Sequence, residues 1–151
     1  MDTPSFTFRL EPVRSVRKQA EARAREELAN ELAQRMRGES LLRQAAAAAA
    51  AARETGRRTA QRASGRELIA AQTWIERSER RQHDAALELD RRDAEVAARR
   101  ETLTRAARER QSIDKLAERR RSEHDRAWAR RSQGELDEIA LAMHRRGTAV
   151  R

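Results

Sequence analysis

Apolar residues recur with a helical period through most of the chain. In its second half, large aliphatic residues fall on one series whose steps are multiples of seven, with Gln82 as the polar member. The series comprises Leu68, Ile75, Leu89, Val96 and Leu103. Three residues after positions of the same seven-residue phase stand partner residues, most of them small: Ala71, Ser78, Ala85, Ala106 and Ile113. A strict seven-residue repeat keeps its seam facing a partner helix when the helices supercoil left-handed, so the pattern predicts a coiled coil.

The first half carries a weaker stripe. Its members are Val13, Ala20, Leu28, Leu42 and Ala49, flanked by Leu32 and Met36. The other faces are charged, and acids precede bases at i,i+4, a spacing that supports helices. The pairs are Glu21 with Arg25, Glu39 with Arg43, Glu76 with Arg80 and Glu95 with Arg99. Eight alanines at 45–52 are strong helix formers, and they are also small enough to let a facing helix approach closely.

Helix breakers cluster at one place. Proline occurs only at positions 4 and 12, while Gly56 and Gly65 bracket the segment GRRTAQRASG. Gly56 suits a helix C′ position with positive φ, and Ser64 with Glu67 has the spacing of a capping box. We therefore predict an all-α fold: a helix over about 10–55, a bend over about 56–65 and a helix over about 67–146. The two long helices would form an antiparallel coiled-coil hairpin, one elongated domain over 1–151, in which the longer second helix overhangs the first beyond about residue 110.

Composition gives two opposing indications. Leu, Ile, Val and Phe make up 22 of 151 residues, which is low enough to suggest disorder, whereas Ala, Glu, Lys, Leu and Arg make up 94, which is typical of coiled coils. The seven-residue period favours the coiled coil. The chain has no cysteine, no apolar run long enough to span a membrane and no hydrophobic N-terminal stretch typical of a secretory signal, so we expect a cytoplasmic protein.

The net charge of +9 is concentrated in one stretch, because residues 99–131 hold 12 basic and 6 acidic residues. Such a stretch can be a solvated helix face, a surface for an acidic protein or a surface for nucleic acid. Interspersed acids and the lack of interleaved aromatic residues disfavour nucleic acid.

Nothing in the sequence has the pattern of a catalytic or metal site. His83, His124 and His144 are scattered, and the contiguous Glu123-His124-Asp125 would fan out around a helix. No phosphate-binding glycine loop or hydrolase motif occurs. We therefore expect a protein that is not an enzyme, with no catalytic residue, metal, cofactor or small-molecule substrate.

Apolar residues outside the seam are candidates for docking. Phe6, Phe8 and Leu10 precede the first helix, Trp74 should point outward beside Ile75, and Trp128 lies on the overhang. Near the C-terminus an apolar stripe follows one helix face, made of Leu136, Ile139, Ala140 and Met143.

Two segments carry a resemblance to a known family. FTFRLEPVRSVRKQAEARAREELA at 6–29 and LAERRRSEHDRAWARRSQGELDEIALAMHRR at 116–146 resemble the two ends of the flagellar export protein FliJ, most specifically in FTFRLEPV and LDEIA. Trp74-Ile75 also fits an aromatic-Ile pair early in the family's second helix. The resemblance implies a two-helix coiled coil similar to the central stalk of rotary ATPases.

The resemblance also implies partners. The paired ends would insert into the hexameric ring of the flagellar export ATPase, the region nearer the bend would contact the membrane export gate, and the protein would assist export chaperones at the cytoplasmic face of the membrane. Carried over to this chain, the ATPase-binding residues would be Phe8, Arg9, Leu10, Val13, Leu136, Asp137, Glu138 and Ile139. The gate-binding residues would be Leu42, Trp74 and Ile75.

Three other functions stay open on the sequence. The chain can be the stalk of a virulence-type type III secretion system, a basic nucleic-acid-binding coiled coil, or a homo-oligomeric structural coiled coil. The polar residues Gln82, Arg92 and Arg99 near the seam disfavour strong self-assembly.

Overall fold

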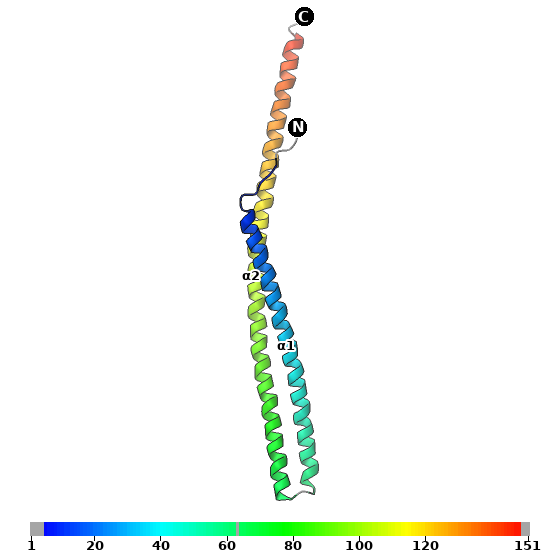
Figure 1. Cartoon of the computed structure of the whole chain (residues 1–151). Helices are drawn as coiled ribbons and strands as arrows, with labels where there is room; N and C mark the ends of the chain where they lie inside the picture. Colours follow the sequence, from blue (N-terminus) through cyan, green and yellow to red (C-terminus); the bar gives the residue numbers. More distant parts are fainter. Residues whose placement is uncertain (1–4, 63, 149–151) are drawn as a thin grey trace. The chain divides into compact units, whose positions relative to one another are not determined.

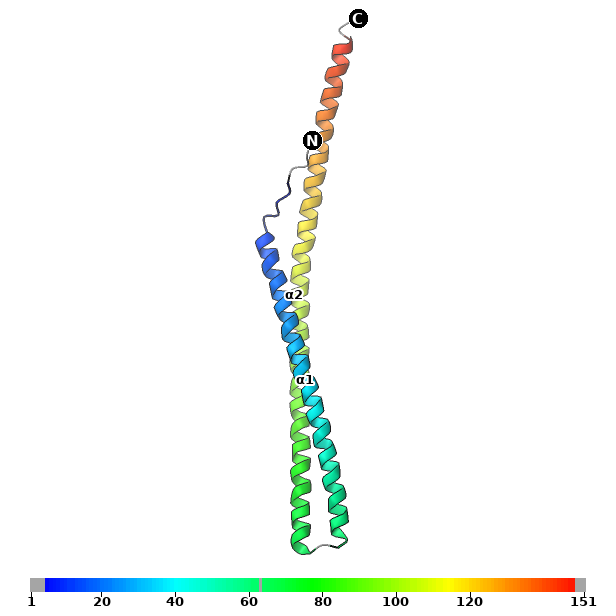
Figure 2. The same ribbon diagram turned by 45° about the vertical axis from the view of Figure 1, so that its right-hand side comes forward.

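Two helices make up almost all of the described chain. The computed structural model describes residues 5–62 and 64–148, and their side chains as far as residue 145. Helix α1 spans Glu11–Ala60 and helix α2 spans Gly65–Thr148. The helices run antiparallel on either side of a short turn (Figures 1 and 2). The prediction of an all-α antiparallel coiled-coil hairpin with a longer second helix is confirmed.

The helix ends follow local chemistry. Pro12 stands in the first turn of α1, where a missing amide removes no helical hydrogen bond. After Ala60 the Arg62 amide donates to the Thr59 carbonyl at 3.1 Å and closes a tight last turn. At the start of α2 the Glu67 carboxylate accepts from the Ser64 amide at 2.7 Å and from the Ser64 hydroxyl at 2.9 Å. These two hydrogen bonds, the backbone one first, lower the pKa of Glu67. Of the two hydrogen bonds that make up a capping box, the one from the Ser64 backbone amide to the Glu67 side chain is therefore present.

The turn is shorter than the sequence indicated, and Gly56 has a different role. It lies inside α1, and no described glycine has a positive φ. A Cβ at Gly56 would lie 2.6 Å from Ile75 Cδ1, which is too close for an undisturbed contact. Glycine at position 56 thus lets the Ile75 side chain approach the α1 backbone, rather than ending the helix.

Packing divides the chain into two units. Residues 21–105 form one, here the turn unit, and the described residues 5–20 and 106–148 belong to the other, here the terminal unit. That residues 1–151 form a single domain stays a prediction.

In the turn unit, the buried side of α2 follows the predicted heptad. Val96 is 4% exposed and Ser78 is 3% exposed, while Ile75, Leu89 and Leu103 are half-buried. Leu68 departs from the prediction, because 41% of its surface is exposed where α1 has already ended. Helix α1 has its own buried seam with a seven-residue repeat, and several of its positions are occupied by charged residues or glycine instead of apolar side chains. Its members include Glu21, Ala24, Leu28, Glu31, Arg35, Gly38, Leu42, Ala49 and Ala52.

The alanine run is part of this seam. Ala49 is fully buried and Ala52 is 2% exposed, although the alanines between them are exposed. Because an alanine side chain is a single methyl, complete burial requires the facing helix to lie directly over it. The run therefore packs against α2 as well as favouring helix.

Candidate functional site

In the terminal unit, the segment 5–10 lies along α2. The rings of Phe6 and His124 have their centroids 5.5 Å apart at an interplanar angle of 56°. A groove between this segment and α2 is lined by Phe8 and Leu10 on one side and by Leu116 and Ala127 on the other. The N-terminal segment thus covers part of the second helix beyond residue 110, where an overhang was predicted.

Ion pairs fix the start of α1 on α2. Arg14 Nε donates to Asp114 Oδ1 at 2.7 Å, and Arg110 contacts the other oxygen of Asp114 at 2.5 Å. The hydrogen bond from Arg14 is the main cause that lowers the pKa of Asp114, and it raises the pKa of Arg14 in return. Arg17 pairs with Glu109 at 2.5 Å.

Farther along α2 an apolar stripe is left uncovered. Leu136 is 55% exposed, Ile139 48% and Met143 68%. Their spacing of three and four residues places them on one face of the helix. Asp137 and Glu138 stand between them in the sequence and are also exposed. Beyond the residues that line the groove, the stripe presents three large exposed apolar side chains on one face of α2.

The eight residues assigned to ATPase binding do not form one cluster. Phe8, Arg9 and Leu10 line the groove whose far end on α2 is Ala127, and 40% of Val13 is exposed. Leu136 comes nine residues after Ala127, which is roughly 13 Å along a helix. The terminal unit therefore holds two separate candidate surfaces.

The three residues assigned to gate binding also lie apart. Leu42 and Ile75 are half-buried in the seam of the turn unit, whereas Trp74 is 48% exposed and points outward as expected. Leu42 lies one turn from Gly38, which faces Leu89, so it is more than two helical turns from Trp74. Of the three, Trp74 alone is an exposed residue, with about half of its surface open to a partner.

A model of one protein family matches nearly the whole chain. The family is described as flagellar FliJ protein, and the match covers residues 6–149. The chain belongs to the FliJ family. No curated protein and no solved structure matches it significantly. Membership in the FliJ family makes the chain a component of flagellar protein export with a stalk-like role.

The sequence analysis of this FliJ-family chain placed Arg92 and Arg99 near the seam but missed the charged partners across it. Arg92 Nη1 donates to Glu31 at 3.2 Å, Arg99 Nη1 donates to Glu27 at 2.8 Å, and Arg35 pairs with Asp93. The hydrogen bonds raise the pKa of Arg92, through Glu31 first, and of Arg35, through Asp93 first.

Some of the ion pairs that were expected within one helix are replaced by pairs with other residues. Glu21 and Arg25 pair at 2.9 Å as predicted, but Arg99 turns to α1 instead of Glu95, and Glu39 pairs with Arg35 instead of Arg43. Of the polar positions expected to weaken the seam, Arg92 and Arg99 are satisfied by acids of the opposite helix in the same chain. They therefore specify this particular pairing of helices.

Within residues 5–62 and 64–148, no group of three or more His, Asp or Glu side chains is placed to hold a metal ion. No described helix is both long and apolar enough to cross a membrane. The surfaces that remain as functional candidates are grooves and helix faces.

Proposed function

We propose that this FliJ-family chain is a non-enzymatic stalk and adaptor of the flagellar export apparatus. Its terminal unit would bind the ring of the export ATPase, its turn unit would bind the membrane export gate, and the chain would assist export chaperones at the cytoplasmic face of the membrane. Membership in a flagellar family supports this role over that of a virulence-type secretion system.

The uncovered stripe of α2 carries the ATPase assignment. Isolated apolar side chains are common on protein surfaces, but three on one helix face are typical of a helix that docks into a groove. Leu136, Ile139 and Met143 have this arrangement, and the acids Asp137 and Glu138 beside them can pair with basic groups at the rim of such a groove.

The charge on α2 supports a mechanical role inside a ring. Six arginines and two acids stand between Arg119 and Arg131, whereas the segment from Glu135 to Glu138 holds three acids and no base. Because a single helical rod has no rotational symmetry about its axis, its charges meet identical ring subunits differently, which would favour nucleotide closure at some of them. Turnover of the ATPase would then depend on the chain.

A matched pair of variants tests the ATPase assignment. Leu136→Ser with Ile139→Ser removes two half-exposed side chains, whose remaining burial in a complex is worth about 1 kcal/mol each, or roughly thirtyfold in affinity together. Leu141→Ser removes a side chain of similar exposure, 56%, from a different face of the same segment. Binding to the purified ATPase and ATP turnover are measured for both.

We expect the double variant to lose binding and stimulation while Leu141→Ser keeps them. Equal losses in both variants, or a wild-type chain that neither binds the ATPase nor changes its turnover or assembly, would contradict the assignment. Far-UV circular dichroism checks that the helices are intact.

The gate assignment depends on Trp74. We expect Trp74→Ala to weaken capture by the cytoplasmic part of the export gate protein and to reduce motility, because its half-exposed ring is the accessible apolar group among the three predicted gate residues. Leu87→Ala is the control, since Leu87 is 45% exposed on the same helix. A Trp74→Ala variant that binds the gate normally would show that another surface is used.

A further inference from the structure

Arginines gather where the two helices of the turn unit end. Between Arg53 and Ile75 there are five arginines and two acids, a net charge of +3. The arginines are Arg53, Arg57, Arg58, Arg62 and Arg66. We call the last four of these, with Leu68 and Ile69, the turn surface.

Few acids neutralise this charge. The side chains of Arg57 and Arg58 are 76% and 78% exposed and share one acid, Glu54. Arg62 and Arg66 are exposed and form no ion pair with any residue in the described ranges. Glu67 is engaged by Ser64 at the start of α2. The positive charge of the turn surface is therefore free to meet an anionic partner.

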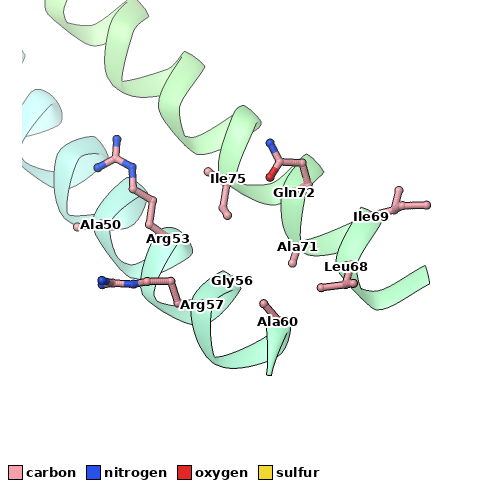
Figure 3. Close-up of a pocket in the computed structure, with 10 residues that line it drawn as sticks. All are labelled: Ala50, Arg53, Gly56, Arg57, Ala60, Leu68, Ile69, Ala71, Gln72 and Ile75. Atoms are coloured by element: carbon pink, nitrogen blue, oxygen red, sulfur yellow. The ribbon is translucent and has the colours of Figure 1, made fainter. Parts of the chain in front are cut away.

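Large apolar side chains stand beside these arginines. Ile69 is 70% exposed and Leu68 is 41% exposed. An open groove near the turn is lined by both of them together with Gly56 and Ala60. In Figure 3 Leu68 extends toward the end of α1, whereas Ile69 points away from α1.

We propose that the turn surface binds an anionic lipid bilayer. The arginines would contact headgroup phosphates, and Ile69 and Leu68 would enter the interface between headgroups and acyl chains. A peptide held in the groove would cover Leu68 and the part of Ile69 that lines the groove, but it would not reach the side of Ile69 that points away from α1. A bilayer meets the end of a hairpin from several sides at once, so it covers both side chains and all four arginines.

Charge alone does not make such a surface, and the terminal unit provides the comparison. Residues 119–131 hold six arginines and two acids, a net charge of +4. None of the large apolar residues that are exposed in the described chain lies in this stretch. Residues 119–131 therefore serve as an internal control: their arginines can be attracted to anionic lipid, but no exposed large apolar side chain beside them can insert.

The test is cosedimentation of the full chain with vesicles. We expect binding to phosphatidylcholine vesicles that contain phosphatidylglycerol, little binding to pure phosphatidylcholine, and weaker binding as salt is raised. Arg62→Gln with Arg66→Gln should weaken binding about twenty-fivefold, since each basic residue near an anionic surface contributes about fivefold. Ile69→Ser should weaken binding about tenfold. Arg130→Gln with Arg131→Gln removes the same charge from the terminal unit and should leave binding nearly unchanged.

A fluorescence measurement separates insertion from surface attraction. With Trp74→Phe and Trp128→Phe as background, Ile69→Trp places the chain's single tryptophan at the turn surface. Its emission should shift to the blue on anionic vesicles. Equal losses from the two arginine pairs, an unaffected Ile69→Ser variant, or capture by polyglutamate without capture by vesicles would each overturn the proposal. None of these measurements requires the ATPase or the export gate, so they stand apart from the tests of the proposed function.

Discussion

Two glycines of α1 should respond differently to the same substitution. Both Gly38 and Gly56 lie in the helix and face α2. Replacing a helical glycine by alanine restricts the unfolded chain and favours the helix by about 1 kcal/mol. Because that gain is common to both positions, the difference between the variants reports on the atoms that the new methyl group meets.

At Gly38 the new methyl would lie 3.5 Å from Leu89 Cδ1, an ordinary van der Waals distance. We therefore expect Gly38→Ala to raise the free energy of unfolding by about 1 kcal/mol and the melting temperature by about 2–4 °C. At Gly56 the methyl would lie 2.6 Å from Ile75 Cδ1, so the isoleucine must leave its rotamer at a cost of about 0.5–1.5 kcal/mol. Gly56→Ala should therefore leave stability nearly unchanged.

Urea denaturation followed by far-UV circular dichroism measures both effects, and Ile75→Val provides the matched background. Valine lacks the Cδ1 atom, and the next atom, Cγ1, is 3.6 Å from the added methyl. In the Ile75→Val background, Gly56→Ala should raise the free energy of unfolding by about 1 kcal/mol relative to Ile75→Val alone. If Gly56→Ala stabilises the wild-type chain as much as Gly38→Ala does, the close approach of Ile75 to the α1 backbone is refuted.

Three further predictions concern ionised groups. Arg92→Leu should lower the urea midpoint because Glu31, whose side chain is only 16% exposed, loses a partner, whereas Glu31→Leu with Arg92→Leu should raise the midpoint above that variant's. Since Arg14 lowers the pKa of folded Asp114, their pairing stabilises the terminal unit above the ordinary carboxyl pKa near 3.9 and loses this effect as the pH falls through the lowered value. In an acid titration, the Asp114→Asn variant should lack the loss of stability that protonation of Asp114 causes. An acid transition identical to that of the wild-type chain would argue against a stabilising Arg14–Asp114 pair. Glu67→Ala should expose the amides at the start of α2 to faster hydrogen exchange, while Glu76→Ala, which is farther into the helix, should not.

Prediction from sequence succeeded for the large aliphatic seam residues of α2 that lie opposite α1, whereas Leu68, where α1 has ended, is exposed. Ile75, Leu89, Val96 and Leu103 repeat every seven residues or a multiple of seven, and the structure buries each of them wholly or in part. In α1 the same period is occupied by residues that apolarity does not mark, such as Glu31, Arg35 and Gly38. Extending the seven-residue phase of Leu28, Leu42 and Ala49 through residues that are not apolar would have found Glu21, Arg35 and Gly56.

The candidate surfaces were predictable to a similar degree. Trp74 lies outside the seven-residue series of the seam, and the stripe from Leu136 to Met143 lies beyond the part of α2 that α1 covers. The exposure of both could therefore be inferred from their positions in the sequence. The packing of Phe6 on His124 could not, because residues more than 100 positions apart meet only when the register of the two helices is known.

The sequence by itself determined that this chain forms two helices, because alanine-rich segments, heptad spacing and one cluster of glycines leave no competing local structure. Tertiary structure alone decided the register, since it depends on which charges of α1 meet which of α2: Arg14 with Asp114, Arg99 with Glu27 and Arg92 with Glu31. It also decided that Gly56 makes room for Ile75 instead of ending a helix. A side chain's distance from a residue on another helix is set by packing, and the local sequence contains no information on that distance.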